Sequence, residues 1–298
     1  MTAPITTERV DFPAGAYTLV GNLHRPVDAP AGPALVVTGS WTTVKEQMAD
    51  RYARLLAAQG FAALSFDFTG FGESGGEPRD VESPALKARD IGHAVTFLTE
   101  HPAVDPARIG ALAICASAGY TALNAVDDER VRCLALIAPW VHDAALVREM
   151  YGGENGVSGR VDAGDAARRR YDQTGIVDYV PAQSATDPAA AMPMAIDFYE
   201  NADRGAVPEW ANRFAVMAWP EWLNFDAVSL ACRVRIPTLI VHSEDAAIPD
   251  GARRFHAALT SEKAIAWTSG TQFDFYDQPA TVSDAVDRAR AHLRRYLR

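Results

Sequence analysis

The sequence is short of cysteine and of basic residues, and each shortage excludes a class of protein. Its 298 residues include three cysteines, Cys115, Cys133 and Cys232, which are too few and too scattered for a disulfide framework or a zinc site. The 28 Lys and Arg against 38 Asp and Glu give a formal net charge of −10. Because phosphate binding needs a basic face, we expect no nucleic-acid partner. A reducing, cytoplasmic compartment fits the cysteine usage.

Long apolar segments are scarce as well. Residues 1–9 lack the apolar stretch of a secretory signal. Residues 109–126 are long enough to span a membrane, but Gly110, Gly119 and Asn124 interrupt them. We therefore expect a strand followed by a buried helix in this segment, and no membrane association.

Short β-rich runs alternate with helically spaced segments, and apolar residues make up 48% of the chain. This alternation predicts an α/β fold with a mainly parallel, doubly wound sheet. We expect strands at residues 7–12, 16–25, 34–38, 61–66, 109–114, 131–138, 237–242 and 264–267. We expect helices at residues 44–59, 85–100, 116–126, 250–260 and 280–297.

The alternation stops after Trp140. Residues 143–228 contain Gly-rich loops and aromatic residues but no strand-like run, which favours a helical cap inserted into a core of residues 1–142 and 229–298. We expect the cap to bind an apolar or aromatic small molecule through Trp210, Phe214, Trp219 and Trp222. The alternative is that these side chains form the core of the cap itself.

A candidate nucleophile lies between the predicted strand at 109–114 and the helix after it. A nucleophile elbow needs small residues two positions on either side of its tip, and Ala113 and Ser117 meet that need around Cys115. The helix N-terminus should lower the thiol pKa, and the Ala116 N–H should form half of an oxyanion hole. A second frame has Ser117 as nucleophile, and we prefer Cys115 because the strand before it is already complete. The non-catalytic interpretation is a small buried cysteine.

Catalytic triads built on such an elbow have their acid and then their histidine later in the chain. Asp245 follows the strand at 237–242 and is the preferred acid, with Glu244 as the alternative and a helix cap as the non-catalytic interpretation. The loop at 269–277 should contain the histidine, but Gln272 occupies the place. His142 follows the strand after the elbow helix, at the sheet edge where ligands bind, and is the candidate substitute.

These motifs together resemble the α/β-hydrolase superfamily, and more closely its dienelactone-hydrolase-related group with a cysteine elbow. The resemblance rests on residues 44–47, 66–79, 114–117 and 273–277. It implies the α/β-hydrolase fold and a triad of Cys115, Asp245 and position 272. It also implies a second oxyanion donor in the segment after the strand at 34–38, for which the Trp41 N–H is preferred. The sequence departs from the family pattern at Gln272.

The missing histidine leaves three functional hypotheses. Glutamine cannot accept a proton at neutral pH, but a cysteine depends less on a base than a serine does, because part of it is already thiolate. We rank first a hydrolase or acyltransferase in which Cys115 attacks an ester, thioester or lactone and Asp245 orients Gln272. A non-covalent lyase, isomerase or cyclase with Asp245 as base comes second. A small-molecule-binding protein comes third. We infer no nucleotide or metal cofactor and leave a homodimer open.

Overall fold

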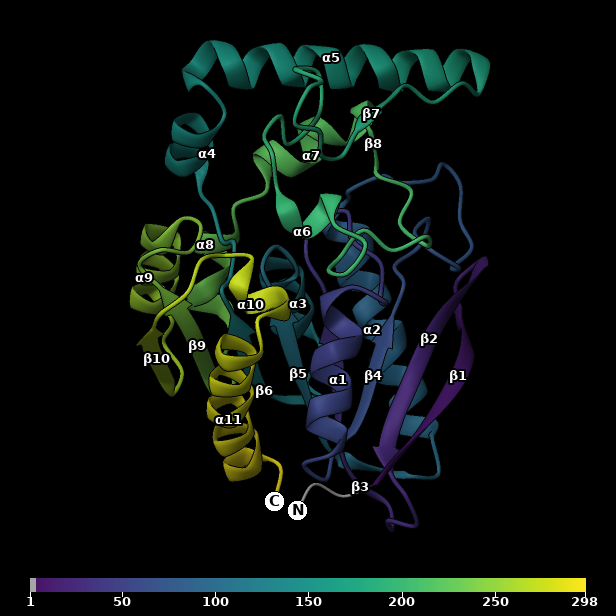
Figure 1. Ribbon diagram of the computed structural model, residues 1–298, viewed down its shortest axis with the longest axis vertical. Coiled ribbons are helices and arrows are strands. Elements are labelled where there is room, and N and C mark those ends of the chain that lie inside the picture. The colour runs from purple at the N-terminus through teal and green to yellow at the C-terminus, as the bar shows by residue number, and fades with distance from the viewer. Residues whose placement is uncertain (1–3) are drawn as a thin grey trace.

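The computed structural model describes residues 4–298 and contains one eight-stranded sheet (Figure 1). The strands from β4 to β10 in spatial order are parallel, while β1 and β2 form an antiparallel hairpin at one edge. The spatial order is β1 (Ile5–Ala14), β2 (Tyr17–Pro26), β4 (Ala62–Phe66), β3 (Gly32–Thr38), β5 (Val104–Ile114), β6 (Val131–Ile137), β9 (Thr238–Ser243) and β10 (Lys263–Thr268). The predicted α/β class with a mainly parallel sheet is confirmed.

Helices cover both faces of this sheet (Figure 1). One face carries α1 and α11, which contact each other, and the opposite face carries the packed pair α2 and α3. The core helices are α1 (Met48–Ala57), α2 (Pro84–Glu100), α3 (Ser117–Asp127), α9 (Pro249–Ala258), α10 (Asp274–Asp277) and α11 (Pro279–Tyr296).

The central strands are apolar along their length because helices bury both of their faces. Leu35, Val36 and Val37 of β3 are all fully buried. The apolar run at 109–126 divides into the end of β5 and the helix α3, as its glycines predict. Within residues 4–298, no helix is both long and apolar enough to cross a bilayer.

The segment after β3 is a loop where a helix was predicted from residue 44. The Val44 N–H is bound by the side-chain oxygen of Gln47, and the Lys45 N–H by the Asp67 carboxylate. Because side chains satisfy these amides, the helix α1 begins only at Met48.

Residues between β6 and β9 form a layer above the carboxyl edge of the sheet, with the long helix α5 at its far side (Figure 1). The prediction that this segment has no strand is wrong, because β7 (Tyr179–Pro181) and β8 (Arg213–Ala215) pair antiparallel. Strands of three residues are too short to produce a visible alternation. The boundaries of the cap at 143 and 228 stay a prediction. The layer contains α4 (Ala144–Met150), α5 (Gly153–Thr174), α6 (Asp197–Glu200), the 3-10 turn η1 (Val216–Ala218) and α7 (Trp219–Asn224). The elements that follow, α8 (Ala227–Leu230) and the 3-10 turn η2 (Ala231–Arg233), lead back to β9 beside the core helix α9.

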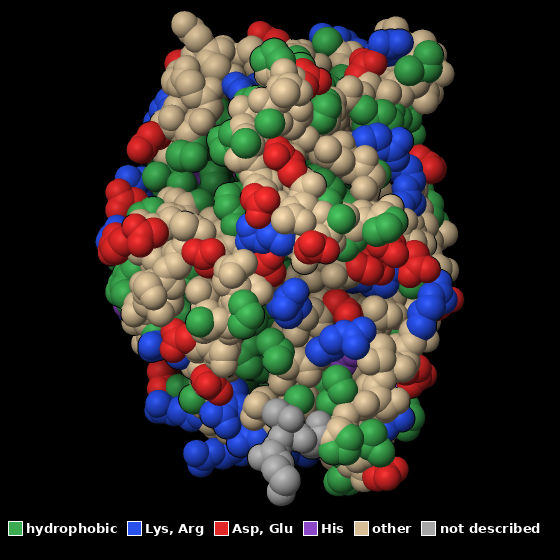
Figure 2. All heavy atoms as spheres, in the orientation of Figure 1, with side chains coloured by type: hydrophobic (Ala, Val, Ile, Leu, Met, Phe, Trp, Pro, Cys, Tyr) green, Lys and Arg blue, Asp and Glu red, His purple; other side chains and the backbone are tan. Residues whose placement is uncertain are grey.

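The surface of the molecule mixes charges of both signs. Figure 2 shows acidic and basic side chains interspersed over one face. This pattern accompanies the net charge of −10 calculated from the sequence.

Candidate active site

Cys115 lies at the tip of a tight turn between β5 and α3. Its N–H donates to the Ile137 carbonyl at 3.0 Å, which continues the strand pairing, and its backbone has a positive φ of 59°. Few residues other than glycine adopt this left-handed conformation, and those that do are concentrated at functional sites. The structure thus has a strained elbow at the position that the small flanking residues indicate.

The alternative nucleophile Ser117 is turned into the sheet. Its hydroxyl donates to the Ile114 carbonyl at 3.1 Å and accepts a hydrogen bond from Thr38 at 2.8 Å, and its side chain is fully buried. Ser117 is not among the residues that line the cavity above the elbow. The geometry therefore favours the frame with Cys115 at the tip.

Four hydrogen-bonding groups surround the Cys115 thiol. Two are the backbone amides of Trp41 and Ala116, and two are the hydroxyls of Ser40 and Tyr276. Burial raises the pKa of the thiol above its ordinary value, and these four contacts only partly oppose it. The prediction of a lowered thiol pKa is therefore wrong, because desolvation outweighs the helix N-terminus and the hydrogen bonds.

Ser40 and Tyr276 were missed by the sequence analysis. The two hydroxyls lie 2.9 Å apart, and Gln272 Nε2 donates to the Tyr276 hydroxyl at 3.4 Å. Burial raises the pKa of Tyr276 well above its ordinary value, so the phenol stays protonated at neutral pH. Two signals were present in the sequence: Ser40 adjoins the proposed oxyanion residue Trp41, and Tyr276 lies four residues after Gln272 in the loop that was expected to carry the histidine.

Gln272 lines the same cavity as Cys115, but its amide is bound by the backbone. Its Oε1 accepts the Ala247 N–H at 3.0 Å, and its Nε2 donates to the Ala138 carbonyl at 3.0 Å. Asp245 is exposed and, within residues 4–298, its carboxylate makes no hydrogen bond to Gln272. The structure thus brings Gln272 to the site and leaves the predicted acid outside it. The alternative acid, Glu244, is also exposed and pairs with Arg253.

His142 does not reach Cys115. Its Nδ1 accepts the Trp140 indole N–H at 2.9 Å, and its Nε2 lies 3.2 Å from the Trp222 carbonyl. With both ring nitrogens engaged and the ring buried, the pKa of His142 is lowered to about 4 by desolvation. His142 is therefore a neutral packing residue next to the cavity wall, not a substitute base for the thiol.

The cavity above Cys115 measures about 240 Å³ and is overwhelmingly apolar. Met150 and Met194 are 48% and 57% exposed, so the cavity opens to solvent beside them. None of the residues that line it is acidic, basic or a histidine. They are Ser40, Trp41, Cys115, Ala116, Trp140, Met150, Tyr151, Met192, Met194, Ile196, Tyr199, Trp222, Ala247, Gln272, Phe273 and Tyr276.

Of the four predicted cap aromatics, only Trp222 lines this cavity. Phe214 and Trp219 pack against the cavity residue Trp41, with ring centroids 4.9 and 5.9 Å from that of Trp41. Trp210 stacks on Tyr199 at 4.9 Å and donates its indole N–H to a backbone carbonyl of the core. Both interpretations of these residues thus apply in part, since three of them pack behind the wall.

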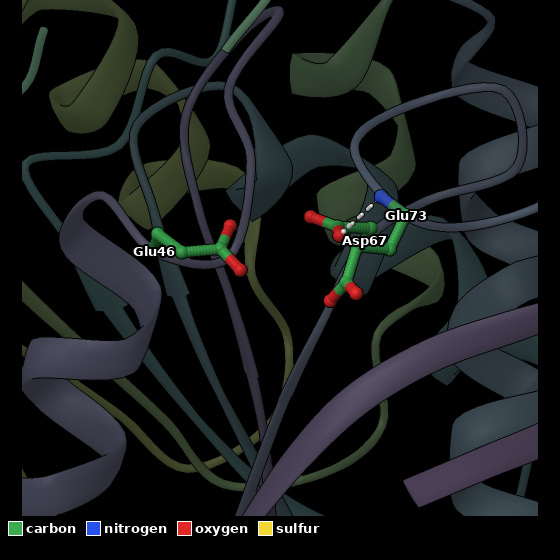
Figure 3. Close-up of side chains that lie close together, drawn as sticks. All are labelled: Glu46, Asp67 and Glu73. Carbon is green, nitrogen blue, oxygen red and sulfur yellow. Dashed lines mark hydrogen bonds between the residues drawn. The ribbon is translucent and has the colours of Figure 1, made fainter. Parts of the chain in front are cut away.

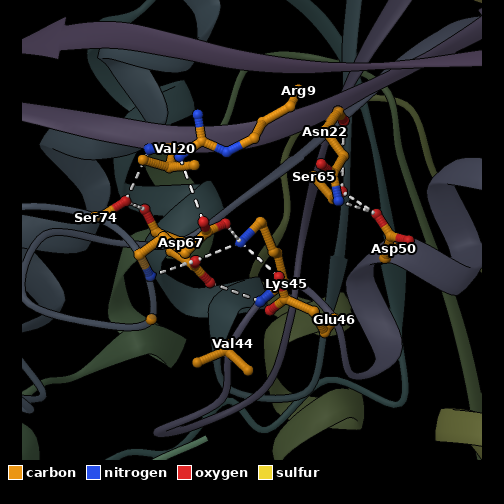
Figure 4. A network of polar contacts seen from close by, with 12 residues as sticks. Arg9, Val20, Asn22, Val44, Lys45, Glu46, Asp50, Ser65, Asp67 and Ser74 are labelled. Atoms are coloured by element: carbon orange, nitrogen blue, oxygen red, sulfur yellow. Dashed lines mark hydrogen bonds and ion pairs between the residues drawn. The ribbon is translucent and has the colours of Figure 1, made fainter. Parts of the chain in front are cut away.

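A cluster of three carboxylates lies apart from this cavity (Figure 3). Oxygens of Glu46, Asp67 and Glu73 come within 4.8 Å of one another. The Lys45 ammonium already pairs with all three, at 2.8 Å from Asp67 and 2.7 Å from Glu73, and its pair with Asp67 is drawn in Figure 4. Burial lowers the pKa of Lys45, but its contacts with Asp67, Glu46 and Glu73 together raise it above its ordinary value. Because a lysine fills the centre, these residues do not fit a metal site.

Comparison with known proteins identifies the family. The model of the Alpha/beta hydrolase family matches residues 34–285. The uncharacterized protein YcjY of Escherichia coli is 31% identical over 266 residues, which is 85% of each chain. Protein PA2218 of Pseudomonas aeruginosa is 30% identical over 93% of this chain and 78% of that protein. The crystal structure of PA2218 superimposes with a TM-score of 0.87, covering 99% of this chain and 95% of that one.

A partial relative carries an informative name. The thiohydrolase aneE of Aspergillus aculeatus is 37% identical over 120 residues, which is 40% of this chain and 37% of that protein. The dienelactone hydrolase of Anabaena variabilis is 16% identical with a TM-score of 0.58 over 99% of both chains, so this likeness shows the fold alone. The α/β-hydrolase fold is confirmed, and the narrower dienelactone-hydrolase grouping stays a prediction.

Proposed function

Because the chain belongs to the alpha/beta hydrolase family, we propose that it transfers an apolar acyl group from a thioester through a covalent intermediate on Cys115. The observation that carries this proposal is the position of the thiol. It lies on a strained elbow beneath an apolar cavity and contacts the backbone amides of Trp41 and Ala116. Two amides in this position can bind the oxygen of a carbonyl that the sulfur attacks.

The first half-reaction exchanges one thioester for another. The Cys115 sulfur attacks the carbonyl carbon, a C–S bond forms, and the oxyanion takes hydrogen bonds from the two amides. Cys115 gives up its proton before the attack, and the hydrogen bonds from Ser40 and Tyr276 favour the thiolate that results. The C–S bond to the leaving thiol then breaks, the leaving group departs as a thiolate, and its later protonation restores the proton that Cys115 lost.

The second half-reaction returns the enzyme to its resting state. An acceptor with an O–H, N–H or S–H group attacks the acyl-cysteine, takes the acyl group and leaves its proton on Cys115. Water as the acceptor makes the enzyme a thiohydrolase, and any other acceptor makes it an acyltransferase. The apolar lining favours an acceptor that binds beside the acyl group over free water.

Among residues 4–298, no aspartate, glutamate, histidine or lysine lines the cavity to act as a general acid, and this favours a thioester over an oxygen ester. A leaving thiol has a pKa near that of cysteine, about 8.5, and departs as a thiolate without help. A leaving alkoxide is far more basic and needs a general acid, whose loss costs ~10²–10⁴-fold. Gln272 cannot supply a proton in this way.

The shape and lining of the cavity indicate the acyl group. With no charged lining residue, the cavity suits an uncharged apolar chain or ring, and burying a charged one there would be costly. The partly exposed Met150 and Met194 mark the side from which the thiol arm of the substrate would extend. The name of the partial relative aneE, a thiohydrolase, supports the same bond type.

The non-covalent alternative has weaker support. It needs Asp245 as a base in the pocket, whereas this residue is exposed and does not line the cavity. A protein that only binds a small molecule would not need the strained backbone at Cys115, so this hypothesis leaves the elbow unexplained. We therefore keep acyl transfer as the proposal.

Comparing two substrates tests the proposal. We expect octanoyl-N-acetylcysteamine to react with a kcat/KM at least about 100-fold higher than the ester in which oxygen replaces the sulfur, because only the thioester leaves without acid help. Cys115→Ser should abolish turnover of both, and Cys232→Ser, at an exposed cysteine, should match the wild type. Equal rates with the two substrates, or turnover that survives in Cys115→Ser, would exclude the mechanism.

A further inference from the structure

A fully buried carboxylate, that of Glu82, lies behind the oxyanion hole. Glu82 belongs to the loop between β4 and α2, does not line the cavity and has no exposed surface. Its oxygens accept hydrogen bonds from the Thr42 N–H at 2.8 Å, the Tyr120 hydroxyl at 2.7 Å and the Lys87 ammonium at 2.8 Å. A buried carboxylate with three donors is held firmly, and it holds its donors in turn.

Two of these donors belong to the segments that carry the two oxyanion amides. Thr42 directly follows Trp41, whose N–H contacts the cysteine sulfur. Tyr120 lies in α3, one helical turn after Ala116, which supplies the other amide. The Glu82 carboxylate thus bridges the loop after β3 and the helix after the elbow, at the place where their separation sets the width of the hole.

The bound segment is conformationally demanding. Thr42 has a positive φ of 59°, a conformation that costs a threonine energy and needs support from its surroundings. Glu82 binds the N–H of Thr42, and Trp210 of the cap layer donates to its carbonyl at 2.8 Å. Residue 42 is therefore held on both sides, which fixes the Trp41–Thr42 peptide, the one adjacent to the Ser40–Trp41 peptide that carries the proposed oxyanion N–H.

The ion pair with Lys87 compensates the cost of burying the charged Glu82 carboxylate. Lys87 is 1% exposed, and its ammonium lies over the rings of Phe71 and Phe68 at 4.1 and 4.8 Å. Burial lowers the pKa of Lys87, while Glu82 opposes that shift. The pair leaves no net charge inside the protein, so Glu82 can remain a strong acceptor.

From these contacts we infer that Glu82 is a positioning residue for the oxyanion hole, which sets the distance between the Trp41 and Ala116 amides. This inference rests on the proposed function, because a hole matters only where a carbonyl oxygen gains charge. Glu82 touches no substrate atom. Its effect should therefore fall more heavily on acylation, which forms an oxyanion, than on the reactivity of the thiol, which the two amides influence only through its pKa.

Two rates measured on Cys115 test the role. Acylation by octanoyl-N-acetylcysteamine forms an oxyanion, whereas alkylation by iodoacetamide does not. Removing one oxyanion donor costs roughly 10²–10³-fold, so displacing one in Glu82→Gln should slow acylation by at least about tenfold. Alkylation should change by less than about threefold, because it forms no oxyanion and senses the two amides only through the thiolate fraction.

Asp90→Asn is the matched control. Asp90 is a buried carboxylate of α2 that binds the Thr69 N–H and hydroxyl and makes no contact with either oxyanion segment. We expect both rates to stay within about threefold of the wild type in this variant. If Glu82→Gln does not fold, Tyr120→Phe keeps the ion pair and should slow acylation selectively by about threefold or more.

Three results would contradict the inference. In a folded Glu82→Gln or Tyr120→Phe protein, acylation at the wild-type rate would exclude the positioning role alone. If the rates of acylation and alkylation fell by the same factor, Glu82 would support the structure in general and would not position the oxyanion hole. A wild-type protein that is alkylated but never acylated on Cys115 would contradict the proposed function and the positioning role together.

Discussion

At the scale of the residue, the chemistry of Cys115 depends on what surrounds its sulfur. Two backbone amides and two hydroxyls contact it, and no cavity residue titrates near neutral pH as a base. Burial raises the thiol pKa, so the resting enzyme holds a neutral thiol. Reactivity must then come from the small thiolate fraction and from stabilisation of the oxyanion.

The pH dependence of acylation follows from this state. Only the thiolate attacks, and its fraction grows tenfold for each pH unit below the thiol pKa. Since that pKa lies above its ordinary value, we expect the acylation rate to rise about tenfold per unit from pH 7 to pH 8.5. Initial rates with octanoyl-N-acetylcysteamine, corrected for spontaneous hydrolysis, would measure the profile. A plateau below pH 8 would contradict it.

Gln272→His provides the contrast for this profile. An imidazole beside the thiol has an ordinary pKa of about 6.5 and could take its proton. The variant should therefore react faster than the wild type at pH 7 and show a flatter profile above that pH. An unchanged profile would mean that a side chain at position 272 does not exchange a proton with the Cys115 thiol.

The sequence predicted the elbow at Cys115 and the two amides beside its sulfur, but not the contacts of Asp245 and Gln272, for a physical reason. Small residues at fixed spacing around Cys115 are a local requirement of the turn, so they can be recognised in the sequence. The relation between Asp245 and Gln272 depends on the paths of two loops from different strands. In the structure the Ala247 N–H donates a hydrogen bond to the side-chain oxygen of Gln272, the residue that Asp245 was expected to orient.

At the scale of the element, a buried ion pair joins the loops that follow β3 and β4. The Asp67 carboxylate binds both the Lys45 N–H and its ammonium, each at 2.8 Å, and also the Glu73 N–H at 3.0 Å (Figure 4). The loop after β3 also carries Trp41. The ion pair therefore anchors the segment that carries the proposed oxyanion amide of Trp41.

Lys45→Met should destabilise the protein markedly. The change leaves the fully buried Asp67 without its cation, and breaking a buried pair on one side costs about 3 kcal/mol or more. Urea unfolding at pH 7 would measure the loss. The double variant Lys45→Met/Asp67→Asn removes both charges and should recover much of the stability.

The pH dependence of this variant distinguishes a lost charge from lost packing. Burial raises the pKa of Asp67 even in the wild type, and removing Lys45 removes its main opposing influence. As the pH falls from 7 to 5, the folded variant takes up a proton on Asp67 before the unfolded chain does. Its stability deficit should therefore shrink on acidification. A deficit that is independent of pH would indicate packing.

At the scale of the whole molecule, the core elements and the presence of an inserted layer could be predicted, but the internal arrangement of that layer could not. The core follows from alternating strands and helices, each identifiable over four or more residues. The cap layer is built from three-residue strands and from aromatic contacts between distant positions, such as Trp41 with Phe214 and Trp219. Pairings of this kind leave no periodic pattern in the sequence.

The central claim is that an acyl group is carried on Cys115, and mass spectrometry of the acylated protein tests it most directly. After brief incubation with octanoyl-N-acetylcysteamine and acid quenching, the intact protein should gain the mass of one octanoyl group. Peptide mapping should place the group on Cys115, with Cys133 and Cys232 unmodified. Turnover of the thioester without any adduct on Cys115, under conditions that trap an intermediate, would contradict the account.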